Sequence, residues 1–137
     1  MGGKRTPPFK EYKAWSEAKF FGWLRGGLRR AFTKWPPKYE VVDLAKREIK
    51  KKRKGMGRFK YEYQCNVCNK WKTRKQVEVD HIHPCGSLKS YEDLVGFCSR
   101  LFVGVDKLQV ICKPCHAVKT KHDAELRKAK EESNNEN

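Results

Sequence analysis

Two cysteine pairs of the same spacing constrain this chain more than any other feature. The first pair is Cys65 and Cys68, the second is Cys112 and Cys115, and residues 69–111 separate them. Four thiolates saturate a tetrahedral zinc ion, which suits a site that holds a fold together and leaves no position open for chemistry. Such a site would supply folding free energy to a chain with only 38% hydrophobic residues. The spacing therefore predicts a structural Zn²⁺ on these four cysteines.

The other two cysteines break this pattern and are interpreted as free thiols. Cys85 follows a turn, and Cys98 lies on an apolar helix face, where we expect it to be buried. The chain shows no signal-peptide core and no apolar run long enough to span a bilayer. We therefore expect a protein of a reducing compartment, the cytoplasm, where paired cysteines bind metal more often than they form disulfides, and no membrane partner.

The charge of the chain predicts a polyanionic partner, most simply DNA bound through its phosphates. The net charge is +16, and residues 1–60 carry most of it, with 19 Lys and Arg against 5 Asp and Glu, a net +14. Residues 61–137 carry 13 against 11, a net +2. This asymmetry predicts a basic helical arm over 1–60, a Cys/His domain over 61–130 and a disordered tail over 131–137.

The arm has a helical pattern in two stretches. Aromatic and aliphatic residues recur at three- and four-residue steps over 9–33, with glycines that favour a split into two helices, and a second helix is predicted over 39–52. One interpretation is a solvated helix pair that packs its aromatics inward, and the other is a DNA-contacting arm; the two are compatible. The predicted phosphate contacts are Arg25, Arg29, Arg30, Lys50, Lys51, Lys52, Arg53 and Lys54.

The second half alternates strands and helices. We predict a strand over 77–81, an amphipathic helix that opens with a Ser90/Asp93 capping box and ends near Gly104, a strand over 108–112, and a final helix over 114–130. The fold class is therefore α+β. This order would bring Asp80 and His81, at the end of one strand, close to His116, at the start of the last helix.

A carboxylate and neutral imidazoles in one place suit a hydrolytic metal site. Asp and His together can bind a divalent ion such as Mg²⁺, Mn²⁺ or Zn²⁺, while a separate imidazole can activate water. Adjacent side chains on a strand point to opposite faces, so Asp80 and His81 need not share one role. That geometry suits one metal ligand and one base.

These motifs resemble the His-Asn-His (HNH) nuclease family. The segment Val79-Asp80-His81-Ile82-x-Pro84, followed by Leu108-Gln109-Val110-Ile111-Cys112-x₂-Cys115-His116-x₂-Lys119-Thr120, is similar to small phage HNH endonucleases with a four-cysteine zinc site. The resemblance covers about residues 61–123. It implies a ββα-metal core, His81 as general base, and Asp80 and His116 as ligands of one catalytic ion, Mg²⁺ or Mn²⁺, with Zn²⁺ or Ni²⁺ as alternatives. It also implies a phage origin, with a phage terminase as partner by analogy.

One residue departs from the family pattern. Lys107 stands where the family usually has an Asn that tethers the loop and orients the base, and a lysine side chain cannot accept a hydrogen bond. Either Asp106 or Gln109 replaces the Asn, or the loop is held in another way, or activity is low.

Four further residues are candidates for accessory roles. His83 could touch the phosphate or the metal, or it could be a turn residue near the site. Thr120 shares the helical face of His116 and could hold a metal-bound water, while Lys119 could bind phosphate or be a plain surface charge. His122 lies off that face and is interpreted as solvated.

Two classes of function remain. The first is a metal-dependent DNA endonuclease, which the combination of Asp80, His81 and His116 favours. The alternative is a non-catalytic zinc module that binds nucleic acid. Its only support is Lys107, which stands where the family has an Asn. A phage packaging accessory protein is a further interpretation, and it is compatible with nuclease activity.

Overall fold

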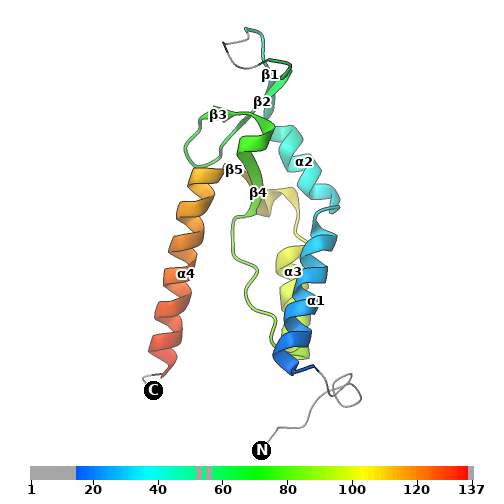
Figure 1. Ribbon diagram of the computed structural model, residues 1–137, viewed down its shortest axis with the longest axis vertical. Helices are drawn as coiled ribbons and strands as arrows, with labels where there is room; N and C mark the ends of the chain where they lie inside the picture. Colours follow the sequence, from blue (N-terminus) through cyan, green and yellow to red (C-terminus); the bar gives the residue numbers. More distant parts are fainter. Residues whose placement is uncertain (1–14, 52–53, 55–56, 136–137) are drawn as a thin grey trace, which may run out of the picture. The chain divides into compact units, whose positions relative to one another are not determined.

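The computed structural model describes residues 15–51, 54 and 57–135 and contains both helices and small sheets, which confirms the α+β class (Figure 1). The chain divides into two compact units, each assembled from two segments. Unit one takes the described residues up to Pro36 together with Cys85–Val103, and unit two takes Pro37–Pro84 and the chain from Gly104 onward. Within the described ranges, no helix combines the length and apolar character needed to cross a bilayer.

Unit one is helical, and aromatic side chains form its core. Its elements are α1 (Glu17–Phe32), the short 3₁₀ helix η2 (Tyr91–Asp93) and α3 (Leu94–Leu101). Phe21 and Phe97 are fully buried, and the ring of Tyr91 meets that of Phe21 edge-on with centroids 5.2 Å apart. Trp35 closes the unit by donating its indole N–H to the carbonyl of Val103 at 2.8 Å.

The described part of the first predicted helix is continuous, so the expected split at its glycines is wrong. Ser16 caps α1 by accepting the backbone N–H of Lys19 at 3.2 Å. The helix then runs unbroken to Phe32, whose side chain is buried together with that of Phe21. Burial of these rings outweighs the weak helix propensity of the three glycines between them. Residues 9–14 of the prediction lie outside the described ranges.

The helix that contains Cys98 begins and ends differently from the prediction. Its first turn is the 3₁₀ helix η2, and α3 ends at Leu101 rather than near Gly104. The predicted capping box is absent from this described segment, because Asp93 accepts the backbone N–H of Lys89 at 2.9 Å and Ser90 makes no side-chain cap.

Unit two contains two small antiparallel sheets between helices. Its first sheet has the order β1-β2-β3, and its second pairs β4 with β5. The elements are α2 (Pro36–Ala45), β1 (Lys46–Glu48), β2 (Tyr61–Gln64), β3 (Trp71–Lys72), β4 (Val77–His81), β5 (Leu108–Cys112) and α4 (Lys113–Asn135), with 3₁₀ turns η1 (Arg74–Gln76) and η3 (Val105–Lys107).

The second predicted helix is too long, because residues 46–48 are a strand. The prediction extended this helix to residue 52, but α2 ends at Ala45 and β1 pairs with β2. Arg47 explains the change: its Nε donates to Glu62 at 2.7 Å, and its guanidinium lies 3.6 Å from the centroid of the Trp71 ring. These cross-strand contacts outweigh local helix propensity.

The strands that carry the site residues agree with the prediction. β4 and β5 have the predicted bounds, and every residue of β5 is buried. Their register sets Asp80 opposite Gln109 and Val77 opposite Cys112. Pairing of the fully buried β5 with the partly exposed β4 therefore places the carboxylate of Asp80 next to the buried amide of Gln109.

The last helix is longer than predicted. It begins at Lys113, so Pro114 lies in the first turn, where its missing N–H costs nothing. It continues to Asn135, which corrects the expectation of a disordered tail for residues 131–135. Strong helix formers continue past Lys130, and Arg127 and Lys128 lie four residues before Glu131 and Glu132, a spacing that supports a helix.

Candidate metal centre

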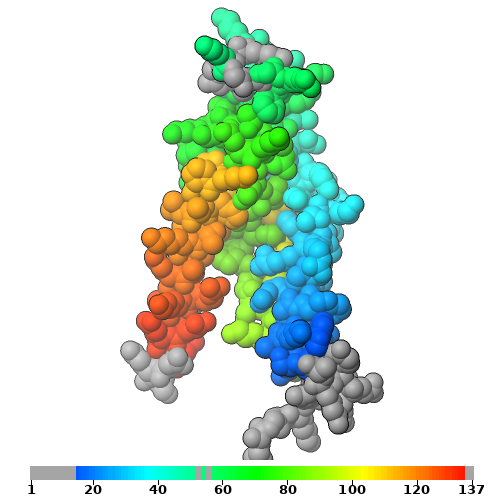
Figure 2. Space-filling view, in the orientation of Figure 1, coloured from blue at the N-terminus to red at the C-terminus, as the bar shows by residue number. Residues whose placement is uncertain are grey.

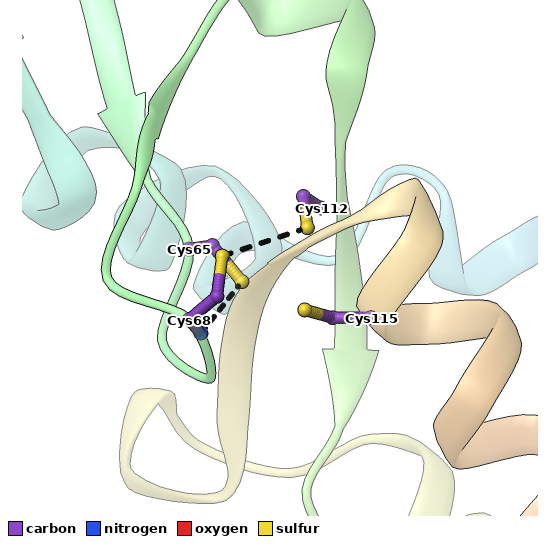
Figure 3. A group of neighbouring side chains, drawn as sticks. All are labelled: Cys65, Cys68, Cys112 and Cys115. Carbon is purple, nitrogen blue, oxygen red and sulfur yellow. Dashed lines mark hydrogen bonds between the residues drawn. The ribbon is translucent and has the colours of Figure 1, made fainter.

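The four paired cysteines converge on one point (Figure 3). All four Sγ atoms lie within 4.8 Å of one another, and those of Cys68 and Cys112 are 3.9 Å apart. A tetrahedral ion with zinc–sulfur bonds of about 2.3 Å separates its sulfurs by about 3.8 Å. The donor set and its spacing therefore fit a structural metal such as zinc.

Two local structures deliver these thiols. The first pair sits on a tight turn after β2, in which Cys65 exchanges backbone hydrogen bonds with Lys70 and Asn69, both at 2.9 Å. Asn69 has a left-handed backbone, with φ of 61°, which lets the turn close. The second pair lies at the end of β5, which carries Cys112, and in the first turn of α4, which carries Cys115. Both side chains point toward the turn that carries the first pair.

The thiols of the metal-free cluster differ in acidity. Burial raises the pKa of Cys65, but backbone N–H groups, including those of Cys68 and Val67, donate to its sulfur and outweigh burial, lowering the pKa to about 6. A hydrogen bond with Cys112, together with desolvation, raises the pKa of Cys115 to about 12. Of these two thiols, Cys65 releases its proton more readily.

The other two cysteines lie in unit one, and neither forms a disulfide within the described residues, as expected. The burial predicted for Cys98 is wrong. Cys85 is the buried one, with its thiol directed at the carbonyl of Arg100 at 3.7 Å, whereas Cys98 is half-buried.

A second cluster of ligand-type side chains joins β4 to α4. Nε2 of His116 lies 3.3 Å from Oδ1 of Asp80, and Nδ1 of His116 lies 2.5 Å from Oε2 of Glu78. Two donors that share one divalent ion at bond lengths near 2.1 Å are separated by about 3.0 to 3.4 Å. The 3.3 Å between Asp80 and His116 lies in this range, and it is also the distance of a direct ion pair between the two side chains.

The remaining oxygen of Asp80 is held by two donors. Gln109 donates its amide to Oδ2 at 2.9 Å, and the ammonium of Lys119 lies 3.2 Å from the same atom. Lys119 also reaches Asp123 at 3.0 Å. Burial lowers the pKa of Lys119, but hydrogen bonds and charge from Asp123 and Asp80 outweigh burial and raise it above 10.5. Lys119 thus stays a cation beside the buried carboxylate.

His81 occupies the next position on β4. It is half-buried, and strand alternation directs its side chain to the face opposite that of Asp80. The metal-type cluster found within the described residues consists of cysteines alone, so His81 is not part of the sulfur cage. The side chains of Asp80 and His116 are in contact, and His81 is the next residue after Asp80 in the chain.

The loop after β4 is tethered through the backbone rather than by a side chain at position 107. The N–H of Ile82 donates to the carbonyl of Lys107 at 3.0 Å. Lys119 adds a second tether, since its ammonium donates to the carbonyl of His81 at 3.1 Å. Gln109 contacts Asp80 and Asn66, so its side chain serves the carboxylate. Three alternatives were open for the loop that lacks the family's Asn at position 107. These contacts match the one in which the loop is held in another way, here through backbone groups.

The accessory candidates lie at the surface of unit two. His83, Thr120 and His122 are all exposed, while Lys119 is half-buried and belongs to the carboxylate cluster instead of being a plain surface charge. Sequence reasoning missed Glu78. The signal that could have found it is its position two residues before Asp80, which places both carboxylates on one face of a strand.

The predicted phosphate-binding residues are exposed wherever the structure describes them. Arg25, Arg29 and Arg30 lie on α1, the blue helix at the surface in Figure 2, and the guanidinium of Arg29 is 5.9 Å from the centroid of the Phe97 ring. Lys50, Lys51 and Lys54 lie in the connection from β1 to β2. Lys52 and Arg53 fall outside the described residues.

Comparisons with protein-family models, with curated proteins and with solved structures give no match for this chain. The chemistry of the two clusters, one of sulfur and one of carboxylate and imidazole, therefore has to carry the assignment of a function.

Proposed function

We propose that this chain is a metal-dependent DNA endonuclease of the HNH type, which hydrolyses phosphodiester bonds. One observation carries the proposal: the carboxylate of Asp80 and the imidazole of His116 are 3.3 Å apart at the junction of β4 and α4. This pair stands next to a four-cysteine cluster in a chain of net charge +16. The sequence resemblance supports the same reading, with Asp80 and His116 in the positions of the family's metal ligands.

Asp80 and His116 would hold a divalent ion, Mg²⁺ or Mn²⁺, which when bound stabilises negative charge on the phosphate and on the leaving oxygen. The neighbouring side chains of the protein orient these two ligands. With an ion bound, Nε2 of His116 would present its lone pair to the ion, and Nδ1 would donate its proton to the carboxylate of Glu78. Gln109 and Lys119 occupy Oδ2 of Asp80 and leave Oδ1 on the side of His116.

His81 is the general base of this proposal. A neutral imidazole takes a proton from water near neutral pH, and His81 is the residue next to the proposed ligand Asp80, with its side chain on the other face of the strand. The bond from Lys119 to the backbone carbonyl of His81 fixes the residue that bears this imidazole. Lys119 thereby fixes a ligand and the base through one ammonium group.

DNA is the proposed substrate, and phosphates are the proposed contacts. The exposed arginines of α1 and the lysines between β1 and β2 offer positive charge without a pattern of groups that would read base edges. Affinity should therefore fall steeply with salt and depend little on sequence.

One observation favours the second candidate, a non-catalytic zinc module that binds nucleic acid. The ammonium of Lys119 already balances the charge of Asp80 at 3.2 Å, so this buried carboxylate needs no ion for the fold. A packaging role beside a phage terminase remains compatible with either candidate. Such a role specifies a protein partner, and it leaves open whether this chain cleaves DNA or only binds it.

The decisive experiment is plasmid nicking in Mg²⁺ or Mn²⁺ with wild-type protein, His81→Ala and the matched control His122→Ala. We expect His81→Ala to lose cleavage by at least about a hundredfold, because general-base catalysis is worth about 10²- to 10⁴-fold. It should keep salt-sensitive DNA binding, and His122→Ala should cut like the wild type.

Two results would separate the candidates. Wild-type protein that binds DNA but never nicks it supports the zinc module and contradicts the endonuclease. Equal cutting by wild type and His81→Ala keeps the endonuclease but assigns the base to another residue.

A further inference from the structure

We infer that the four-cysteine turn positions the catalytic carboxylate through a relay of two amides, from Asn66 to Gln109 to Asp80. This inference rests on the proposed function, since it assigns positioning residues to the proposed metal ligand. It makes the sulfur cluster a determinant of the active site's geometry as well as of the fold.

The relay consists of two hydrogen bonds. Asn66, in the spacer of the first cysteine pair, donates its side-chain amide to Oε1 of Gln109 at 2.9 Å. Gln109 then donates its own amide to Oδ2 of Asp80 at 2.9 Å. Both Gln109 and Asp80 are more than nine-tenths buried, so water cannot easily replace the bond between these two side chains.

The order of donors gives the relay a direction. An amide group can turn over and present its oxygen where its NH₂ was, and this would set an oxygen against the carboxylate of Asp80. The NH₂ of Asn66 opposes that turn, because it donates to the oxygen of Gln109 at 2.9 Å in the orientation seen. The Gln109 NH₂ then has to face Asp80.

The backbone attaches the same turn to the strand that bears Gln109. The N–H of Asn66 donates to the carbonyl of Val110 at 2.8 Å, one residue beyond Gln109. The two bonds of Asn66, one from its backbone and one from its side chain, fix the cysteine turn to β5. Because Gln109 pairs with Asp80 across the sheet, the position of the turn is passed to the metal ligand.

The test measures binding of Mn²⁺ to the zinc-loaded protein, from the electron paramagnetic resonance signal of free Mn²⁺. The variants are Asn66→Ala, Gln109→Met and the double variant, with Val67→Ala as a matched control in the same cysteine spacer. Loss of a partner of a metal ligand weakens metal affinity by about 10- to 100-fold. We therefore expect each single variant to bind Mn²⁺ at least about tenfold more weakly and Val67→Ala to bind it normally.

Non-additivity is the signature of the relay. If Asn66 acts through Gln109, the double variant should bind Mn²⁺ no more weakly than Gln109→Met alone. A purely structural role for each residue would multiply the two losses. Zinc content, measured on every sample, should remain one ion per chain.

Three results would overturn the relay. Normal Mn²⁺ affinity in Gln109→Met removes its last step, whatever Asn66→Ala does to the zinc site. A double variant whose loss is the product of the two single losses makes the residues independent. Wild-type protein that takes up no Mn²⁺ removes the proposed metal site, and the relay with it, whereas the first two results leave the endonuclease standing.

Discussion

Glu78 holds the imidazole of His116 on the side away from Asp80, with its Oε2 at 2.5 Å from Nδ1. This contact sets which ring nitrogen meets Glu78 and which one faces Asp80 at 3.3 Å. If His116 holds the proposed ion, the carboxylate behind it would make it a more basic ligand, so the contact would affect the strength of metal binding as well as its geometry.

The variant Glu78→Gln tests this role. Glutamine keeps a hydrogen-bond acceptor but loses the charge, so we expect Mn²⁺ affinity and nicking rate to fall by about tenfold or more. The control is Glu92→Gln, which neutralises an exposed carboxylate of η2 in unit one. Equal affinity in both variants would show that the carboxylate behind His116 has no influence on the metal.

Loss of one thiol of the cluster should unfold unit two. Cys68→Ser leaves three sulfurs, and a structural zinc ion contributes folding free energy on the order of 10 kcal/mol. We expect the variant to lose zinc, measured by mass spectrometry, and its cooperative thermal transition. Cys98→Ser, which changes a half-buried thiol outside the cluster, should keep both. A folded, zinc-free Cys68→Ser protein would contradict the structural role.

Lys119 should matter more for stability than its neighbour Lys121. Its ammonium contacts Asp80, Asp123 and the carbonyl of His81, and removal leaves a buried carboxylate with one partner fewer. We expect Lys119→Met to lower the free energy of unfolding by about 1–3 kcal/mol. Lys121→Met changes an exposed lysine of the same helix and should have an effect within about 0.5 kcal/mol. Urea titrations of zinc-loaded samples compare the two.

The arginines of α1 should set the salt dependence of DNA binding. Each phosphate contact contributes about 0.9 to the slope of log affinity against log salt. Replacing Arg25, Arg29 and Arg30 by Gln should therefore reduce the slope by about 2.7, measured by fluorescence anisotropy on a DNA duplex. The matched control replaces Arg127, Lys128 and Lys130, which removes the same charge from α4. An equal loss of slope in both would indicate diffuse attraction and not a contact surface.

The sequence predicted the second half of the chain better than the first. β4 and β5 have the expected bounds because alternation in 77–81 and a buried run in 108–112 are strong local patterns, and cysteine spacing alone sufficed for the sulfur cluster. The strand at 46–48 was missed because its stabilising contacts are distant in sequence: Arg47 meets Glu62 and Trp71. Local propensity contains no information about such partners.

The same distinction between local patterns and partners distant in sequence applies to the candidate site. Asp80, His116 and the cysteines carry spacing that a motif records, and the contact of Asp80 with His116 agrees with it. Glu78, Gln109 and Asn66 act through hydrogen bonds between residues 29 to 43 positions apart. Only the register of β4 against β5 and the fold of the cysteine turn determine which of these polar side chains meet.

Cys115 and His116 are consecutive residues in the first turn of α4, so a sulfur ligand and the imidazole share one short piece of rigid backbone. An ion of larger radius in the sulfur cluster that moved Cys115 would therefore move the backbone of His116 as well. Exchange of that ion would thus offer a way to shift His116 while every amino acid stays the same.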